Sequence, residues 1–415
     1  MGTHDPRRTI EDLRNHLAVH DRRLAFLFGA GTSIAVNIAP TQGTSQKQRH
    51  EPLIPGIEGL TKICEQSINS LGDLQAKAWG ILACQCKQAA LPANVENMLT
   101  KVRMKIDAIG EGENLLGLDH KQLSEIERKI CATIAKAACP AEEKIPSQTP
   151  HDDFASWAKK VKRTAPLEIL TTNYDILFER ALETSRIPFY DGFVGTYHPF
   201  FYPESIDDDN LLPSVNWIRL WKLHGSINWQ FVNGPDGKHI IRTQPGENGE
   251  MILPSHRKYD ESRKRPYVAY MDRLTRILNT EHGLLITCGY SFGDPHINAI
   301  MFEALENKNT ANIIALQFQD IRNSEELVQT ALQRPNLTVI GPNAGVISST
   351  WGTWQLTQPV DNKTSPFMDS AFDSNALPED QGSPAATSGD LIGRMRLGDF
   401  NWFCRFLKEM GAGIQ

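Results

Sequence analysis

The stretch Leu24-Ala-Phe-Leu-Phe-Gly-Ala-Gly-Thr-Ser33 decides the fold of this chain. It begins with a short run of apolar residues, which is typical of a strand buried on both faces of a parallel sheet. Gly29 and Gly31 then allow a tight turn and a close approach of the backbone to a ligand. Thr32 or Ser33 is placed to cap a following helix, whose N–H groups would face an anion. The stretch therefore predicts a strand, a phosphate-binding turn and a helix.

This turn alone does not identify a ligand. Ile34 stands where a dinucleotide-binding fingerprint needs its third glycine, and no Gly-Lys-Thr or Gly-Lys-Ser follows to make a P-loop. A strand-to-helix turn without a ligand is the alternative. A conventional dehydrogenase is disfavoured, because the region about 20 residues past Gly29 is not a strand ending in an acidic residue.

Length and composition are those of a soluble protein with more than one compact part. The chain has 415 residues, of which 40% are hydrophobic and 22% charged. Its net charge of -6 argues against a generally basic surface, so we expect no direct nucleic-acid binding. This net charge is still compatible with a local basic patch. No run approaches the roughly 18 apolar residues of a membrane span, and no apolar segment follows the charges of Met1–Arg8, so we expect no signal peptide. We expect a cytoplasmic protein without a membrane segment.

The seven cysteines are scattered and include no Cys-x-x-Cys pair. Cys84 and Cys86 form the only close spacing. We interpret them as reduced residues of a helix and predict no metal or redox site.

A helical insertion is predicted after the glycine turn. Ala39–Gly59 is rich in Pro, Gly, Thr, Ser and Gln, which indicates a loop or flap over the site. Apolar residues then recur at helical spacing in Gly59–Leu71, Gln75–Cys86, Val95–Ile106, Lys121–Ala138 and Asp153–Val161. These segments predict a helical subdomain inserted at about residues 45–163.

Strands and helices alternate from there to Ile340. The predicted strands are Leu167–Thr171, Trp217–Leu223, Leu284–Cys288, Asn312–Phe318 and Leu337–Ile340. The predicted helices are Ile176–Glu183, Tyr267–Leu278, Pro295–Leu305 and Glu325–Leu332, and Ile227–Val232 with Lys238–Arg242 reads as a hairpin. The alternation predicts an α/β protein with a Rossmann-like, doubly wound parallel sheet in residues 1–345.

Four polar or glycine-rich clusters each follow a predicted strand: Gly29–Ser33, Thr172–Asp175, His224–Ser226 and Gly289–Asp294. The carboxyl ends of parallel strands meet at one edge, where open α/β sheets bind their ligands. We therefore expect the clusters to meet there.

Each residue of these clusters also has a structural interpretation when it is taken alone. Asn173 could cap a helix, and His224 could be a core histidine that bonds a backbone carbonyl. Asp175 and Asp294 would each be favourable in the first turn of a helix.

At these residues the chain resembles the sirtuin-like NAD-binding family. Gly29–Ser33 is similar to the family's Gly-Ala-Gly-x-Ser phosphate loop, and Thr171–Asp175 to its Thr-x-Asn-x-Asp motif. Leu223–Ser226 resembles its catalytic Leu-His-Gly-Ser. Gly289–Asp294 stands in place of the family's later Gly-Thr-Ser turn, on the adenosine side. The resemblance runs from about Leu24 to Ile340.

The resemblance implies a role for each site residue. Asn173 would hold the nicotinamide ribose or the attacking water, His224 would act as a base near a ribose hydroxyl, and Asp175 would orient the site. The residues that it implies for NAD binding are Gly29, Ala30, Gly31, Thr32, Ser33, Thr172, Gly289, Ser291 and Asp294.

Two departures separate the chain from deacylating sirtuins. A closed zinc site needs four N or S ligands at workable spacing. The chain has no set of cysteines with such spacing, so it cannot form the four-cysteine zinc ribbon. The sirtuin Thr-Gln-Asn is also Thr-Thr-Asn here. Both features resemble the bacterial sirtuin-like effectors of anti-phage defence, which hydrolyse NAD.

The resemblance therefore implies an NAD+ hydrolase that forms nicotinamide and ADP-ribose, with NAD as substrate and no zinc. The alternatives are an NAD-dependent protein deacylase and a non-catalytic assembly module that senses NAD or ADP-ribose. The chain length resembles the short sirtuin-like subunit that works beside a HerA-type ATPase, which implies that partner.

The C-terminal part, residues 346–415, divides into a linker and a helix. Pro359–Asp390 is rich in Ser, Pro, Asp, Asn and Ala, and Leu391–Met410 is dense in aromatic residues among Arg and Lys. Such a helix either packs back on its own domain or docks on another subunit. We expect a homo-oligomer with this helix as an assembly element.

Overall fold

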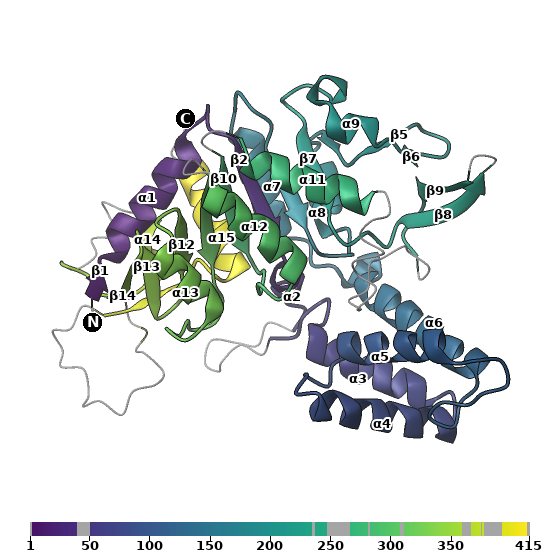
Figure 1. Cartoon of the computed structure of the whole chain (residues 1–415). Helices are drawn as coiled ribbons and strands as arrows, with labels where there is room; N and C mark the ends of the chain where they lie inside the picture. The colour runs from purple at the N-terminus through teal and green to yellow at the C-terminus, as the bar shows by residue number, and fades with distance from the viewer. Residues whose placement is uncertain are drawn as a thin grey trace, which may run out of the picture.

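The computed structural model describes residues 2–39, 50–234, 237–246, 266–280, 283–307, 311–358, 367–374, 376 and 392–412. Its centre is a parallel sheet (Figure 1) in the order β7 (Ile218–Lys222), β3 (Glu168–Thr171), β2 (Leu24–Phe28), β10 (Leu284–Cys288), β11 (Asn312–Leu316) and β12 (Leu337–Ile340). Numbered along the chain, these strands lie in the 3-2-1-4-5-6 order of the Rossmann fold. The predicted fold class is confirmed.

The sheet extends beyond these strands at both edges. β4 (Phe189–Tyr190) pairs with β7, and β13 (Ala344–Ile347) pairs antiparallel with β12. β14 (Thr350–Trp354) follows β13, and β1 (Gly2–His4) pairs with β14. The sheet thus continues past Ile340, where we expected it to end. The reason is that the alternation of small and large residues in this hairpin lacks the apolar run that marks the central strands.

Strand side chains alternate between two helical layers, as pleating requires. From β2, Phe26 and Phe28 enter a core shared with α1 (Pro6–Ala18), α7 (Pro150–Lys160), α8 (Leu177–Thr184), α14 (Met368–Ala371) and α15 (Phe400–Ala412). Ala25 and Leu27 enter the opposite core, with α11 (Tyr267–Leu278), α12 (Pro295–Asn307) and α13 (Glu326–Gln333). The main body is a three-layer α/β/α structure.

The inserted segment forms a helical bundle with its own core. α3 (Ile57–Asn69), α4 (Asp73–Gln88), α5 (Val95–Ala108) and α6 (His120–Ala138) pack together, set apart from the sheet in Figure 1. These four helices were predicted. The fifth predicted helix, α7, packs on α8 and α15 instead, because its Phe154 and Trp157 face Phe26. Cys84 and Cys86 lie on α4 as expected and are free.

Smaller elements complete the described chain. The predicted hairpin forms from β8 (Trp229–Gly234) and β9 (Gly237–Arg242), and it joins β5 (Phe193–Val194) and β6 (Phe200–Phe201) in a small sheet. The others are α9 (Glu204–Asp207), the 3-10 turns η1 (Glu142–Lys144) and η2 (Asp209–Leu211), and the pair β15 (Phe372–Asp373) and β16 (Arg394–Met395). Among the described residues, no helix has the length and apolarity to cross a membrane.

The terminal helix α15 packs on its own chain. Phe400 and Phe403 lie 5.3 and 6.1 Å, between ring centroids, from Phe28 and Phe26. Burial of these aromatic rings therefore needs no second subunit, and the argument from exposed aromatics for an assembly helix does not hold. The homo-oligomer stays a prediction. Part of the predicted linker, Pro359–Asp390, is ordered instead, because its residues 367–374 form α14 and β15 and place Met368, Ala371 and Phe372 in the core. Apart from residue 376, the rest of that range lies outside the described residues.

His151, in the first turn of α7, is fully buried between aromatic rings. Its ring centroid lies 4.6 Å from that of Phe178 and 5.1 Å from that of Phe400. Neither ring nitrogen has a hydrogen-bond partner within the described part of the chain. Burial lowers the pKa of His151 to about 4, although the charges of Asp175 and Asp152 act in the opposite direction. The core therefore accepts only the neutral ring.

Replacing His151 with Leu should make the protein more resistant to acid. Below the ordinary pKa of 6.5 the unfolded chain takes up a proton that the folded chain refuses, so stability falls as the pH drops towards 4. The loss is about 2 kcal/mol near pH 5 and about 3 kcal/mol near pH 4. Urea unfolding of His151→Leu at neutral and acidic pH measures it. His120→Leu, at an exposed position of α6, is the control, and an unchanged pH dependence in His151→Leu would contradict the prediction.

Candidate functional site

The four polar or glycine-rich clusters follow the carboxyl ends of four adjacent parallel strands. Gly29–Ser33 follows β2, Thr172–Asp175 follows β3, His224–Ser226 follows β7, and Gly289–Asp294 follows β10. They share one edge of the sheet. β2 and β10 flank the point at which the strand order reverses, which is where doubly wound sheets bind nucleotides.

The helix that follows the glycine turn is not capped by the residues that we predicted. Gly29 is the N-cap of the short helix α2 (Ala30–Ile34), so Thr32 and Ser33 lie inside the helix and do not cap it. The Thr32 hydroxyl donates back to the Gly29 carbonyl at 2.9 Å. The prediction was wrong because the helix begins directly at the end of the strand, two residues before the first hydroxyl.

A buried chain of hydrogen bonds joins the β2 and β3 clusters. Asn173 Nδ2 donates to Thr32 Oγ1 at 2.9 Å and to Ser33 Oγ at 2.8 Å. Ser33 Oγ donates to Asp175 Oδ2 at 2.6 Å, and Asp175 Oδ1 accepts from the N–H of Leu177 at 3.0 Å. Asn173 is therefore not a helix cap; its amide nitrogen holds the two hydroxyls, and Asp175 binds the start of α8.

His224 and Asp294 form a second buried pair. His224 Nε2 lies 3.0 Å from Asp294 Oδ2. An ionised carboxylate can only accept, so with Asp294 ionised the bond is donated by Nε2–H. Asp294 Oδ1 also accepts from the N–H groups of His296 and Ile297, at 2.9 and 3.3 Å. Asp294 thus holds both the imidazole ring and the start of α12.

The remaining residues predicted for NAD binding surround these pairs. Thr172 is half-buried, and its N–H donates to the Phe28 carbonyl at 3.1 Å. Ala30 and Ser291 are exposed, on the turns that follow β2 and β10.

Lys222 is a site residue that the sequence interpretation missed. It ends β7, is 2% exposed, and donates from Nζ to the backbone oxygen of Asp175. Its Nζ also lies 3.1 Å from Glu179 Oε1. Burial raises the pKa of Glu179, and the charge of Lys222 opposes that shift. The pair holds the turn that carries Asn173 and Asp175. The only signal in the sequence is a lysine inside an otherwise apolar strand end.

Tyr174 connects the site with the inserted bundle. Its ring packs on the bundle core and lies 6.5 Å, between centroids, from the ring of His224. Its backbone oxygen accepts from the N–H of Ile227 at 3.0 Å and from Ser226 Oγ at 3.3 Å. Burial raises the pKa of the Tyr174 hydroxyl, and the negative charge of Glu96 on α5 adds to the effect. The bundle therefore reaches the site through Tyr174.

Gly31 is required by packing between the turns. Its N–H donates to the Gly289 carbonyl at 2.9 Å, and a Cβ at Gly31 would lie 2.6 Å from the Gly289 Cα. Gly289 itself has φ +65 and faces the backbone of Gly31 and Thr32. We had attributed Gly31 to a close approach of the ligand. The contact between the two turns accounts for it without one.

Replacing Gly31 with Ala should destabilise the fold. The added methyl group must displace backbone at Gly289, which costs about 1–3 kcal/mol. Gly80→Ala in α4 is the matched control, because a Cβ there has no atom within 4 Å and alanine favours a helix by up to about 1 kcal/mol. Thermal unfolding of both variants measures the difference. Equal melting temperatures would show that the turns can separate without cost.

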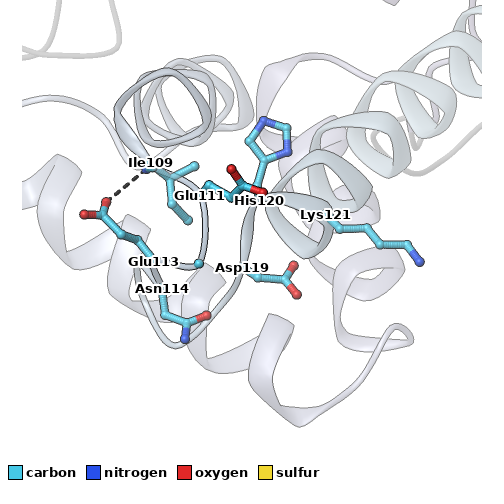
Figure 2. A pocket seen from close by; sticks show the side chains of 9 residues that line it. Ile109, Glu111, Glu113, Asn114, Asp119, His120 and Lys121 are labelled. Atoms are coloured by element: carbon cyan, nitrogen blue, oxygen red, sulfur yellow. Dashed lines mark hydrogen bonds between the residues drawn. The ribbon is translucent and has the colours of Figure 1, made fainter.

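A large pocket lies elsewhere, in the loop between α5 and α6 (Figure 2). Its volume is about 620 Å³, and it belongs to the inserted bundle. Glu113 there accepts from the N–H of Gly110 at 2.9 Å, and Asp119 caps α6. These polar groups fix the loop, and no residue of the four clusters lines this pocket. Across the described residues, no group of three or more His, Cys, Asp and Glu side chains is placed to hold a metal ion.

A protein-family model matches part of this chain. Residues 167–340 match the family model of the SIR2-like domain. The match includes the clusters after β3, β7 and β10, whereas Gly29–Ser33 lies outside it and reaches the site through β2. No curated protein matches the chain. The match supports a sirtuin-like family and, in general terms, an NAD-related activity.

Proposed function

We propose, from the SIR2-like domain of residues 167–340, that this chain is an NAD+ hydrolase that cleaves the bond between nicotinamide and ribose. The observation that carries the proposal is the buried chain of hydrogen bonds that joins Asn173, Thr32, Ser33 and Asp175. It lies on the same edge of the sheet as the His224–Asp294 pair, next to the reversal of strand order.

The reaction makes three demands on a protein. Nicotinamide leaves as a neutral base, so no general acid is needed, and the ribose carbon becomes positively charged. Water adds to that carbon and loses one proton, and the products are nicotinamide, ADP-ribose and a proton. The protein must hold the pyrophosphate, stabilise the cationic sugar and place one water.

The site residues fit these demands. The N–H groups of Gly29, Gly31 and Thr32 donate to backbone carbonyls, so the pyrophosphate falls to the other N–H groups of the turns Gly29–Ser33 and Gly289–Asp294. The Asp175 carboxylate stabilises positive charge on the sugar, and Asn173 Oδ1 orients the water or a ribose hydroxyl. His224 acts as the base, and Asp294 is a positioning residue that fixes the orientation of the ring.

The biological setting rests on the sequence resemblance. We propose that NAD hydrolysis depletes NAD in anti-phage defence, in a homo-oligomer beside a HerA-type ATPase. Support comes from the absence of a four-cysteine zinc ribbon in this sequence and from the Thr-Thr-Asn motif. Co-purification of this chain with a HerA-type ATPase tests the partner.

His224→Ala should abolish most NAD cleavage without unfolding the protein. Loss of a general base lowers turnover by at least about 100-fold. Chromatographic measurement of the nicotinamide and ADP-ribose released from NAD gives the turnover. His198→Ala, on an exposed loop, is the matched control and should keep wild-type turnover. Substantial turnover in a folded His224→Ala protein would remove His224 from the mechanism.

Asn173→Ala should also abolish cleavage, with a measurable loss of stability. It leaves two buried hydroxyls without their donor, which costs about 1–3 kcal/mol. The assay therefore needs a temperature below the melting point of this variant. A folded Asn173→Ala protein with wild-type turnover would contradict the assignment.

The same assay decides between the alternatives. Nicotinamide release from NAD alone indicates a hydrolase. Release that requires an acyl-lysine peptide would identify a deacylase. Calorimetric binding of NAD or ADP-ribose without any cleavage would identify the sensing module.

A further inference from the structure

A second cleft lies at the opposite edge of the sheet. It has a volume of about 200 Å³, and its lining includes Leu167, which precedes β3, and Ile218, which begins β7. The cleft therefore sits at the amino ends of β3 and β7, whereas the Thr172–Asp175 and His224–Ser226 clusters follow their carboxyl ends.

The cleft is basic although the protein is acidic. Lys159, Lys162, Arg163 and Arg186 line it, and no Asp or Glu is among its lining residues. The whole chain has 49 acidic and 43 basic residues, so composition does not explain this cluster. By contrast, the buried Arg273 is matched by Glu168 at 2.7 Å. The ion pairs among the described residues include none of the four cleft cations.

Two of these cations build the wall of the cleft. Arg163 donates to the carbonyl oxygens of Leu17, Val19 and Arg22 at 3.1, 2.6 and 2.9 Å, and its Nε is buried without a hydrogen-bond partner in the described structure. Lys159 Nζ donates to the Ser185 carbonyl at 2.8 Å. Lys162 and Arg186 are exposed, so their charged ends can reach a ligand.

An exposed indole completes the cleft. Trp217 lines it and is 38% exposed. Cationic side chains bind phosphate oxygens by charge-assisted hydrogen bonds, and an exposed aromatic ring stacks on a planar base. We propose that this cleft binds a nucleotide, with its phosphate held by Lys162 and Arg186 and its base on Trp217. A free nucleotide and the 5′-phosphorylated end of a nucleic-acid strand both present this chemistry. The net charge of the chain argues against a generally basic surface, but it is compatible with a local basic patch such as this cleft.

Calorimetric titration with ADP tests the cleft. Lys162→Glu combined with Arg186→Glu should weaken ADP binding at least about tenfold, since two charge-assisted contacts are lost. Trp217→Ala should weaken ADP binding but not the binding of inorganic phosphate. Lys77→Glu combined with Lys87→Glu, on exposed positions of α4, makes the same change in net charge and should bind as the wild type. Thermal unfolding confirms that each variant is folded. If the double variant does not fold, the single variant Lys162→Ala replaces it.

Each outcome decides the proposal. Equal ADP affinity in the cleft and control variants overturns it, because ADP would then bind elsewhere, such as at the candidate active site. Equal affinity for ADP and inorganic phosphate also overturns it, because the base would contribute nothing. Tighter binding of a 5′-phosphorylated oligothymidine than of ADP, lost in the cleft variants, identifies a strand end as the source; the reverse order identifies a free nucleotide. The binding result does not depend on whether the chain hydrolyses NAD, so the two proposals fail separately.

Discussion

The site depends on the contact between two glycine turns where the strand order reverses. Gly31 and Gly289 approach so closely that a Cβ on either would meet the backbone of the other turn at less than 3 Å. This approach fixes the turn after β2 against the turn after β10. Thr32 and Ser33 are thereby directed towards β3, where Asn173 donates to both hydroxyls. The contact between Gly31 and Gly289 thus positions the groups that hydrogen-bond at the ends of β2, β3 and β10.

The buried polar groups of the site are held from both directions. On one side, Asn173 and Ser33 form a continuous chain to Asp175, and on the other, Lys222 donates to the Asp175 backbone and pairs with Glu179. In a poorly solvated interior such bonds strengthen one another, and a missing member leaves an expensive unsatisfied group. Bonds within the protein therefore hold the side chains proposed for NAD chemistry, and electrostatic stabilisation of a cationic sugar requires such preorganisation.

The sequence predicted the elements and the edge of the sheet better than it predicted contacts. The apolar run of β2 and the polar residues that follow each strand are local signals, and the alternation of strands and helices predicts a doubly wound parallel sheet. The His224–Asp294 pair is different. β7 and β10 are separated by β3 and β2, roughly 14 Å across, so these side chains meet only because their loops reach over two strands. The dense aromatics of α15 likewise indicated burial but not that Phe26 and Phe28 would cover them.

The inserted bundle is mechanically part of the site. Tyr174 stands between Asn173 and Asp175 in the chain, yet its ring packs on the bundle core while its carbonyl accepts from Ser226 and Ile227. The amino end of the same strand, β3, is fixed by Glu168, which accepts from Arg273 and from the Trp221 indole. A displacement of α5 relative to the sheet cannot be absorbed by sliding β3. It must instead move Tyr174, and with it the backbone that places Asn173 and Asp175.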